Sequence, residues 1–128
     1  MLLQLTDVSS EPLHSQISRQ LRALILAGDL NSGTALPSIR GLARQEKVSV
    51  ITVQRAYEDL EREGLILARR GKGFFVAGLS DTRKDAMAQD RFRDALSQVL
   101  QEALAEGLDP GTLKEIFEGL LSPNGGAA

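Results

Sequence analysis

The sequence predicts a mainly helical α+β fold, in which an N-terminal winged helix-turn-helix is followed by a C-terminal region of two helices. Two short helices joined by a tight turn, at residues 38–46 and 49–63, indicate the helix-turn-helix. Two apolar runs that flank the basic loop 69–73 indicate a β-hairpin, the wing. A long amphipathic pattern from about residue 81 indicates the C-terminal helices. The 128 residues suffice for one small domain and an appendage.

The first helix is predicted to follow about a dozen extended residues. Helical periodicity begins at Ile17 and continues through Leu21, Leu24 and Ile25. Pro12 lies near the expected start and Gly28 near the expected end, which suits a helix of about four turns.

Serines are expected to begin both helices of the helix-turn-helix. Ser38 and Ser49 are good N-caps, because a serine hydroxyl can accept a hydrogen bond from a free backbone N–H. One face of the second helix is apolar and is expected to be buried (Val53, Ala56, Tyr57 and Leu60). Glu58 and Arg62 are spaced to pair on its outer face. Gly64 ends the helix, and strands are expected at 65–68 and 74–77.

The C-terminal part is predicted to contain a long helix and a shorter one. The long helix runs from about Asp81 to Ala105 or Glu106, and Gly107 ends it. Asp109 and Pro110 are suited to the cap and first position of the shorter helix. The tail, residues 122–128, is expected to be disordered.

The charge is unevenly divided between these two parts. Residues 1–78 contain ten Lys and Arg against eight Asp and Glu, whereas residues 79–128 contain five against nine. The N-terminal part is therefore net basic although the whole chain carries a net charge of −2.

Composition argues against several classes of protein. The chain has no cysteine and a single histidine, His14, so we expect neither a metal site nor a bound cofactor. A row of aspartates (Asp81, Asp85, Asp90 and Asp94) is better explained as a solvated helix face than as a cation site. No triad or paired-carboxylate arrangement suggests an enzyme. No apolar run could span a membrane and the N-terminus does not resemble a secretory signal, so the expected location is the cytoplasm.

The helix-turn-helix supplies the candidate DNA contacts, because the N-terminal end of its second helix reaches base edges in the major groove. The residues available there are Ser49, Val50, Ile51, Thr52, Gln54 and Arg55. Val50 and Ile51 suit thymine methyl groups; the alternative is that one or both of them fold into the turn. Gln54 suits adenine and Arg55 suits guanine or phosphate; the alternative is a solvated helix face.

Phosphate contacts are expected from the preceding helix and from the wing. Ser38 and Arg40 lie at a helix N-terminus, which attracts phosphate, although Ser38 alone could act only as a cap. Arg69, Arg70 and Lys72 place three positive charges within four residues of the wing, next to Gly71 and Gly73. The alternative is a hairpin tip that only aids solubility.

The stretch from Pro12 to Val76 resembles the N-terminal domain of GntR-family transcription regulators. The resemblance covers about half of the chain and rests on an ordered set of matches: Pro12, Gln16-Ile17, Gly28-Asp29-Leu30, Gly33, Leu36-Pro37-Ser38-Ile39-Arg40, Leu42-Ala43, Val48-Ser49, Thr52-Val53, Ala56-Tyr57, Leu60, Gly64 and Gly71-Lys72-Gly73. It implies a bacterial dimeric repressor, or less often an activator, that binds a short palindrome. The DNA-contact positions that it implies are Ser38, Arg40, Ser49, Val50, Ile51, Thr52, Gln54, Arg70, Lys72 and Gly73. Val50 departs from the family, whose members often carry a polar, basic or small turn residue at this position.

The region after the wing is similar in length to that of the short YtrA-type branch of the family. About fifty residues follow Val76, too few for the larger ligand-sensing domains or the aminotransferase-like domain of other branches. A small-molecule effector is left open.

The C-terminal helices are predicted to form a dimer interface, because an isolated amphipathic pair is marginally stable. The predicted interface residues are Phe92, Leu96, Val99, Leu100, Leu104, Leu113, Ile116, Phe117 and Leu120. The alternative is packing on the chain's own N-terminal domain.

These observations predict a cytoplasmic homodimer that regulates transcription by binding a palindromic operator in double-stranded DNA. Residues 1–78 would bind DNA and residues 79–128 would pair the subunits. The alternative function is a winged-helix module that binds another protein and has no specific affinity for DNA.

Overall fold

The computed structural model of the chain describes residues 3–122. Residues 123–128, nearly all of the tail expected to be disordered, lie outside the described residues. The chain divides into two compact units, the first ending at Ala86 and the second beginning at Met87, and each is described by itself.

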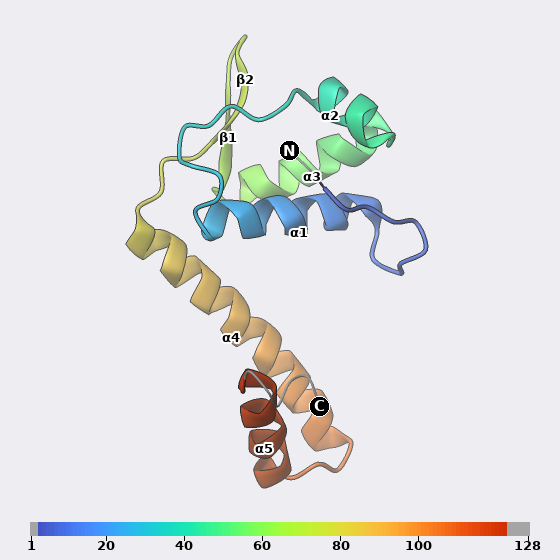
Figure 1. Cartoon of the computed structure of the whole chain (residues 1–128), viewed down its shortest axis with the longest axis vertical. Coiled ribbons are helices and arrows are strands. Elements are labelled where there is room, and N and C mark those ends of the chain that lie inside the picture. Colours follow the sequence, from blue (N-terminus) through green and yellow to red (C-terminus); the bar gives the residue numbers. More distant parts are fainter. Residues whose placement is uncertain (1–2, 123–128) are drawn as a thin grey trace. The chain divides into compact units, whose positions relative to one another are not determined.

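The first unit has the predicted winged helix-turn-helix architecture (Figure 1). Helix α1 spans Leu13–Leu26, α2 spans Ile39–Glu46 and α3 spans Val50–Arg62, and the hairpin consists of β1, Ile66–Arg69, and β2, Gly73–Val76. Both α1 and α2 pack on α3, and α3 also contacts β1. Helix α3 is therefore held on its inner side by three elements.

The core of this unit consists of the apolar faces of the three helices and the inner face of the hairpin. The residues at most 2% exposed include Ile17, Leu21, Ile25, Leu42, Val53, Ala56, Tyr57, Leu60, Leu65, Ile66 and Val76. Burial of each large side chain stabilises the fold by roughly 1.5–3 kcal/mol. The periodicity at Ile17, Leu21 and Ile25 is confirmed, and Leu24 lies at the edge of this core.

The hairpin is shifted by one residue from the predicted strands. Ile66 pairs with Val76 and Arg69 pairs with Gly73, so the strands are 66–69 and 73–76 rather than 65–68 and 74–77. Leu65 and Ala77 lie just outside the strands: the N–H of Leu65 bonds to the carbonyl oxygen of Leu60 at the end of α3, while its own carbonyl oxygen accepts from the N–H of Ala77. Gly73, at φ 94°, completes the pairing with Arg69 and shortens the tip to residues 70–72.

A third segment, residues 33–36, pairs with the outer edge of β2, and the sequence pattern does not predict it. Ala35 forms a β-bridge with Phe75, the N–H of Leu36 donates to Phe74 O, and the N–H of Val76 donates to Thr34 O. The hairpin therefore has a hydrogen-bonded neighbour on one side, which fixes its base. Four residues before a proline carry too little periodicity to predict a strand.

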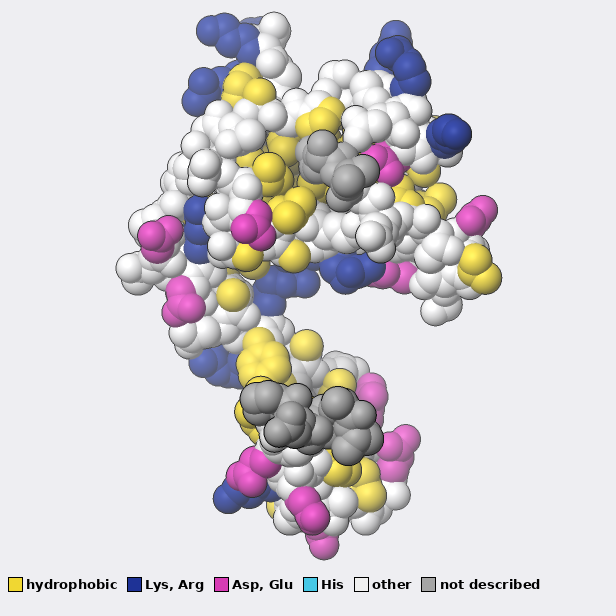
Figure 2. Space-filling view, viewed as in Figure 1, with side chains coloured by type: hydrophobic (Ala, Val, Ile, Leu, Met, Phe, Trp, Pro, Cys, Tyr) yellow, Lys and Arg dark blue, Asp and Glu magenta, His cyan; other side chains and the backbone are white. Residues whose placement is uncertain are grey.

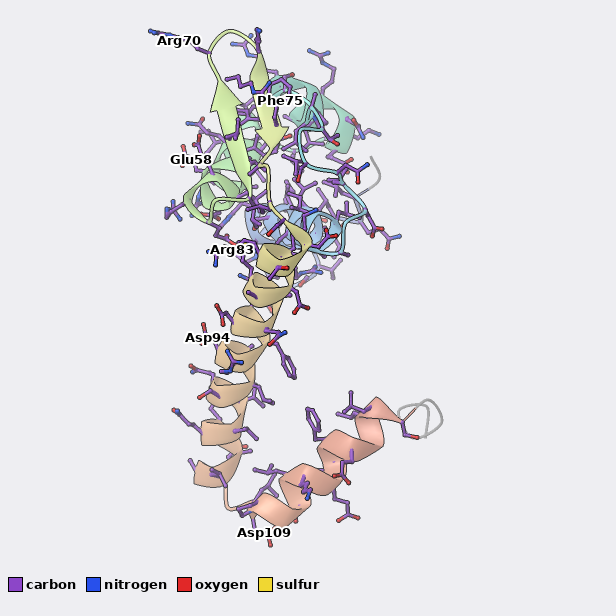
Figure 3. The ribbon with its side chains drawn as sticks, turned by 90° about the vertical axis from the view of Figure 1, so that its left-hand side faces the viewer. Glu58, Arg70, Phe75, Arg83, Asp94 and Asp109 are labelled. Carbon is purple, nitrogen blue, oxygen red and sulfur yellow. The ribbon has the colours of Figure 1, made fainter. Side chains whose placement is uncertain are left out.

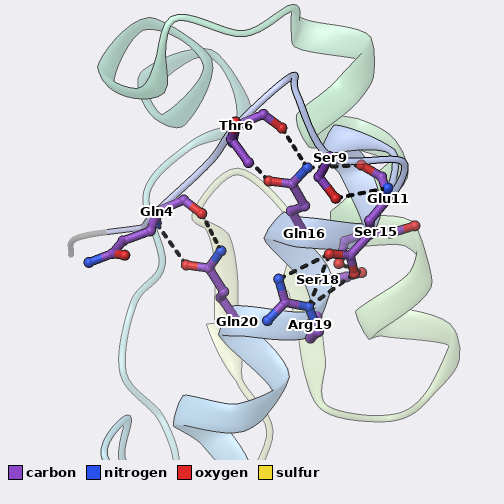
Figure 4. A network of polar contacts seen from close by, with 9 residues as sticks. All are labelled: Gln4, Thr6, Ser9, Glu11, Ser15, Gln16, Ser18, Arg19 and Gln20. Atoms are coloured by element: carbon purple, nitrogen blue, oxygen red, sulfur yellow. Dashed lines mark hydrogen bonds and ion pairs between the residues drawn. The ribbon is translucent and has the colours of Figure 1, made fainter.

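Two glutamines on α1 hold the extended N-terminal segment (Figure 4). The Gln16 amide accepts from the N–H of Thr6 and donates to the Thr6 and Glu11 carbonyl oxygens, at 2.7–2.9 Å. The Gln20 amide bonds to the N–H and carbonyl of Gln4 at 2.8 and 2.7 Å. Residues four apart on a helix and two apart on an extended chain have nearly the same spacing, so both amides reach a peptide group.

The C-terminal helices form where the sequence predicts them. Helix α4 spans Asp81–Ala105 and continues from the first unit into the second, and α5 spans Pro110–Leu121. The chain turns between them at Gly107, which has φ 97°. The Asp109 carboxylate accepts from the N–H of Thr112 at 2.8 Å and caps α5, and this bond holds the pKa of Asp109 below its ordinary value. Within residues 3–122, no helix is both long and apolar enough to cross a bilayer.

Candidate nucleic-acid interface

The turn between α2 and α3 is defined by two serine caps and one left-handed residue. Ser38 Oγ accepts from the N–H of Gly41 at 2.9 Å, and Ser49 Oγ accepts from the N–H of Thr52 at 3.0 Å. Lys47 ends α2 with φ 57°, and its N–H bonds to Ala43 O. Both predicted caps are confirmed, and they fix the start of each helix.

Gly41 is part of this arrangement, although it is not among the predicted site residues. A Cβ added at Gly41 would lie 2.9 Å from Ser38 Oγ, so any side chain there would displace the capping hydroxyl. A glycine inside a short helix, three residues after a capping serine, is the signal that could indicate this role, because glycine is otherwise unfavourable in a helix.

Two sets of contacts hold α3 against the rest of the unit. Near the middle of α3, the Tyr57 hydroxyl donates to the carbonyl oxygen of Pro37 at 2.7 Å, and its ring meets Phe74 edge-on at 5.1 Å between centroids. At the C-terminal end, Arg22 on α1 donates two hydrogen bonds to Glu63, at 2.7 and 2.6 Å. The outward side chains of α3 therefore project from a fixed helix.

The outward face of α3 carries the side chains predicted to read bases. Val50, Ile51, Gln54 and Arg55 are exposed, whereas Thr52 is half-buried and its hydroxyl bonds to Ser49 Oγ at 2.8 Å. The predicted alternative, in which Ile51 folds into the turn, is wrong, since Ile51 is 68% exposed.

The ion pairing on this face differs from the predicted pair of Glu58 and Arg62. Arg62 bonds instead to Asp59 at 3.0 Å, and Glu58 accepts from Gln54 at 3.2 Å. Side chains three and four residues apart are both neighbours on a helix. Arg62 therefore pairs with Asp59, three residues earlier, and Glu58 bonds to Gln54, four residues earlier. Gln54 is therefore held along the helix in the unbound chain.

The start of α2 lies beside this face. Ser38 and Arg40 are exposed, and so is Arg44 one turn further along α2. Ser38 Oγ uses an acceptor position for its cap, which leaves the hydroxyl proton for another acceptor. Arg40 and Arg44 take part in no ion pair recorded for the described residues.

The wing carries three cations, one of which packs against an aromatic ring. Arg70 and Lys72 are exposed at the tip, and Figure 3 shows Arg70 pointing away from the strands. The Arg69 guanidinium lies over the Phe75 ring, 4.7 Å from its centroid. Arg69 thus stiffens the wing, and the positive φ angles of Gly71 in the tip (74°) and Gly73 at the start of β2 (94°) allow the tight turn.

Together these residues make two cationic groups on one unit. Figure 2 shows dark-blue side chains along the edge of the first unit that carries the hairpin tip, some over the tip and others over the α2–α3 side. The exposed cations of this unit include Arg70 and Lys72 in the wing, and Arg40, Arg44 and Arg55 in the helices. Such a surface attracts phosphate groups. Within residues 3–122, no His, Asp or Glu cluster could hold a metal ion.

The residues predicted to pair subunits lie on α4 and α5 and are largely uncovered. Those with exposed side chains are Phe92, Val99, Leu100, Leu104, Ile116, Phe117 and Leu120, while Leu96 and Leu113 are half-buried. Leu96, Leu100, Leu104, Leu113 and Phe117 line an apolar groove between the two helices. Leu108, which the periodicity does not include, is also exposed in this unit.

Comparison with known proteins gives consistent matches. The family model described as bacterial regulatory proteins, gntR family, matches residues 13–76. The chain is 32% identical to the HTH-type transcriptional repressor YtrA of Bacillus subtilis over 89% of its length and 88% of the relative's.

Solved structures agree with the sequence relatives. YtrA from Sulfolobus acidocaldarius, a GntR-family transcription factor, is 30% identical and superposes with a TM-score of 0.65 over 82% of this chain and 99% of that chain. The DNA-binding domain of AraR in complex with operator ORE1 is 27% identical and superposes with a TM-score of 0.50 over 60% of this chain and 94% of that chain.

Proposed function

The chain belongs to the gntR family of bacterial regulatory proteins, and we propose that it represses transcription by binding a palindromic operator as a homodimer. The similar proteins include a transcriptional repressor and a DNA-binding domain in complex with its operator. Double-stranded DNA is accordingly the proposed partner, and the cytoplasm is the proposed place of action.

The observation that carries this proposal is the exposed first turn of α3 flanked by cations on both sides. In a helix-turn-helix, this part of the second helix enters the major groove. Arg40 and Arg44 on α2, and Arg70 and Lys72 in the wing, are exposed and free to neutralise phosphates on either side of such a helix. Gln54 and Arg55 would reach base edges or phosphates.

The proposed dimer rests on the uncovered apolar faces of α4 and α5. Exposed phenylalanine, leucine, isoleucine and valine side chains in two adjacent helices form a patch that is unfavourable in water. A second copy of the chain would cover the same patch on its partner, and two-fold pairing is the commonest assembly. We propose that residues 79–128 pair the subunits while residues 1–78 bind one half-site each.

Selection of duplexes from a random DNA library by the purified chain tests this function. We expect enrichment of a palindrome, with half-sites related by the dimer axis and affinity that falls steeply as salt concentration rises. A chain that enriches no sequence, and whose binding partners are proteins captured independently of salt, would instead be the predicted interaction module.

A further inference from the structure

In the first turn of α3, hydroxyl groups bond to one another within the protein and apolar side chains project into solvent. The hydroxyls of Ser49 and Thr52 bond to each other, and Ser49 also caps the helix N-terminus, so the pair has one hydroxyl proton left for an outside acceptor. The side chains that project into solvent are apolar: Ile51 is 68% exposed and Val50 is 44% exposed. Val50 and Ile51 therefore offer carbon rather than hydrogen-bonding groups at the start of the proposed DNA-reading surface.

The surroundings of this apolar pair indicate the chemistry of its partner. Gln54 and Arg55 lie one helical turn after Ile51 and border it on the same face. Both are exposed, and the free cations of α2 and the wing flank the same surface. An apolar protein partner would leave these charges uncompensated, whereas the DNA major groove offers phosphates at its edges and thymine methyl groups on its floor.

We propose that Ile51 and Val50 read thymine 5-methyl groups in each operator half-site, an inference that rests on the proposed function. Ile51, the more exposed of the two, packs on one methyl group, and Val50 packs on a second. Gln54 can then pair with an adenine next to these contacts, once it releases Glu58. The half-site is therefore recognised partly by exclusion of water from methyl groups.

Replacement of thymine by uracil in the selected operator tests this directly. Deoxyuridine keeps every hydrogen-bonding group of the base pair and removes only the 5-methyl group. Each thymine is replaced in turn, symmetrically in both half-sites. We expect two positions at which the dissociation constant rises about fourfold per half-site, the loss equivalent to one buried methyl group.

Protein variants assign the effect to the side chains. Ile51→Ala should bind thymine and uracil operators equally at one position, and Val50→Ala should do so at the second. Val8→Ala is the matched control, because Val8 is 93% exposed and lies in the segment before α1. It should keep the full preference for thymine. Thermal unfolding of each variant checks that these surface changes leave the fold intact.

The outcomes separate this inference from the function on which it rests. Specific DNA binding that is indifferent to uracil at every thymine would overturn methyl reading and leave the regulator proposal standing. A preference for thymine that persists in both alanine variants would also overturn the assignment to Val50 and Ile51. Failure to bind any specific duplex would overturn both proposals.

Discussion

The hydroxyl of Tyr57 donates a hydrogen bond to the carbonyl oxygen of Pro37, with 2.7 Å between the two oxygens. Tyr57 lies in the middle of α3, and Pro37 directly precedes Ser38, the N-cap of α2. The bond therefore ties the helix proposed to read bases to the start of the helix proposed to contact phosphate. The bond lies on the side of the motif that faces the core, and it fixes the distance between these two helices.

Tyr57→Phe should lower the free energy of unfolding by about 1–2 kcal/mol, because the part-buried carbonyl of Pro37 loses its donor while the ring remains. Urea unfolding followed by circular dichroism measures this. An unchanged midpoint would mean that water replaces the hydroxyl without cost.

Stability should also fall at alkaline pH because of this residue. Burial raises the pKa of Tyr57 above its ordinary value of 10.0, so the hydroxyl stays protonated in the folded chain. The unfolded chain loses that proton above about pH 10, so the stabilisation present below this pH decreases as pH rises. Tyr57 is the single tyrosine, and tyrosinate absorbance should appear together with unfolding. In Tyr57→Phe the alkaline decrease should be smaller.

Local patterns are sufficient to predict most of the first unit. The caps at Ser38 and Ser49 and the buried face from Val53 to Leu60 depend on short-range spacing, and both are confirmed. The Tyr57–Pro37 bond and the bridge at Ala35 join residues 20 or more positions apart, so no periodicity indicates them. Likewise, the sequence could not decide whether Ile51 is exposed, since that depends on the packing angle of α3.

Gln16 and Gln20 make similar hydrogen bonds in surroundings of different burial. The two residues therefore allow a comparison of how much stability is lost when a buried amide or a more exposed amide is removed. Both bond to a peptide group of the N-terminal segment, but Gln16 is 2% exposed and its bonds are part-buried, whereas those of Gln20 are exposed. Gln16→Ala should lower the free energy of unfolding by about 2–3 kcal/mol, because it leaves three part-buried backbone groups without this partner.

Gln20→Ala should cost less, about 1 kcal/mol or below, because water can bond to the groups it releases. Chemical unfolding of the two variants side by side gives the comparison. Equal losses would show that burial does not determine the strength of this clamp.

The wing should contribute to DNA binding through charge alone. Arg70→Ala combined with Lys72→Ala should weaken binding to all duplexes and reduce the slope of log affinity against log salt by about one for each phosphate that the wing no longer neutralises. Fluorescence anisotropy over a range of salt concentrations measures both. Arg83→Ala, which removes an exposed charge in the first turn of α4, is the control and should leave the slope unchanged. An unchanged slope in the wing variant would remove the wing from the interface.

The apolar groove between α4 and α5 should determine the oligomeric state. Leu100→Lys places a charge in this groove and should convert the proposed dimer to a monomer, because the ammonium group would be buried without a partner. Gln98→Lys introduces the same side chain about half a helical turn away, next to Glu102, and should leave the dimer intact. Sedimentation velocity of the two variants gives the answer, with circular dichroism to confirm that both keep their helices. The monomer should bind an isolated half-site as the unmodified chain does and lose only its advantage on the palindrome. If Leu100→Lys stays dimeric, the subunits pair through another surface, and the apolar faces of α4 and α5 require a different partner.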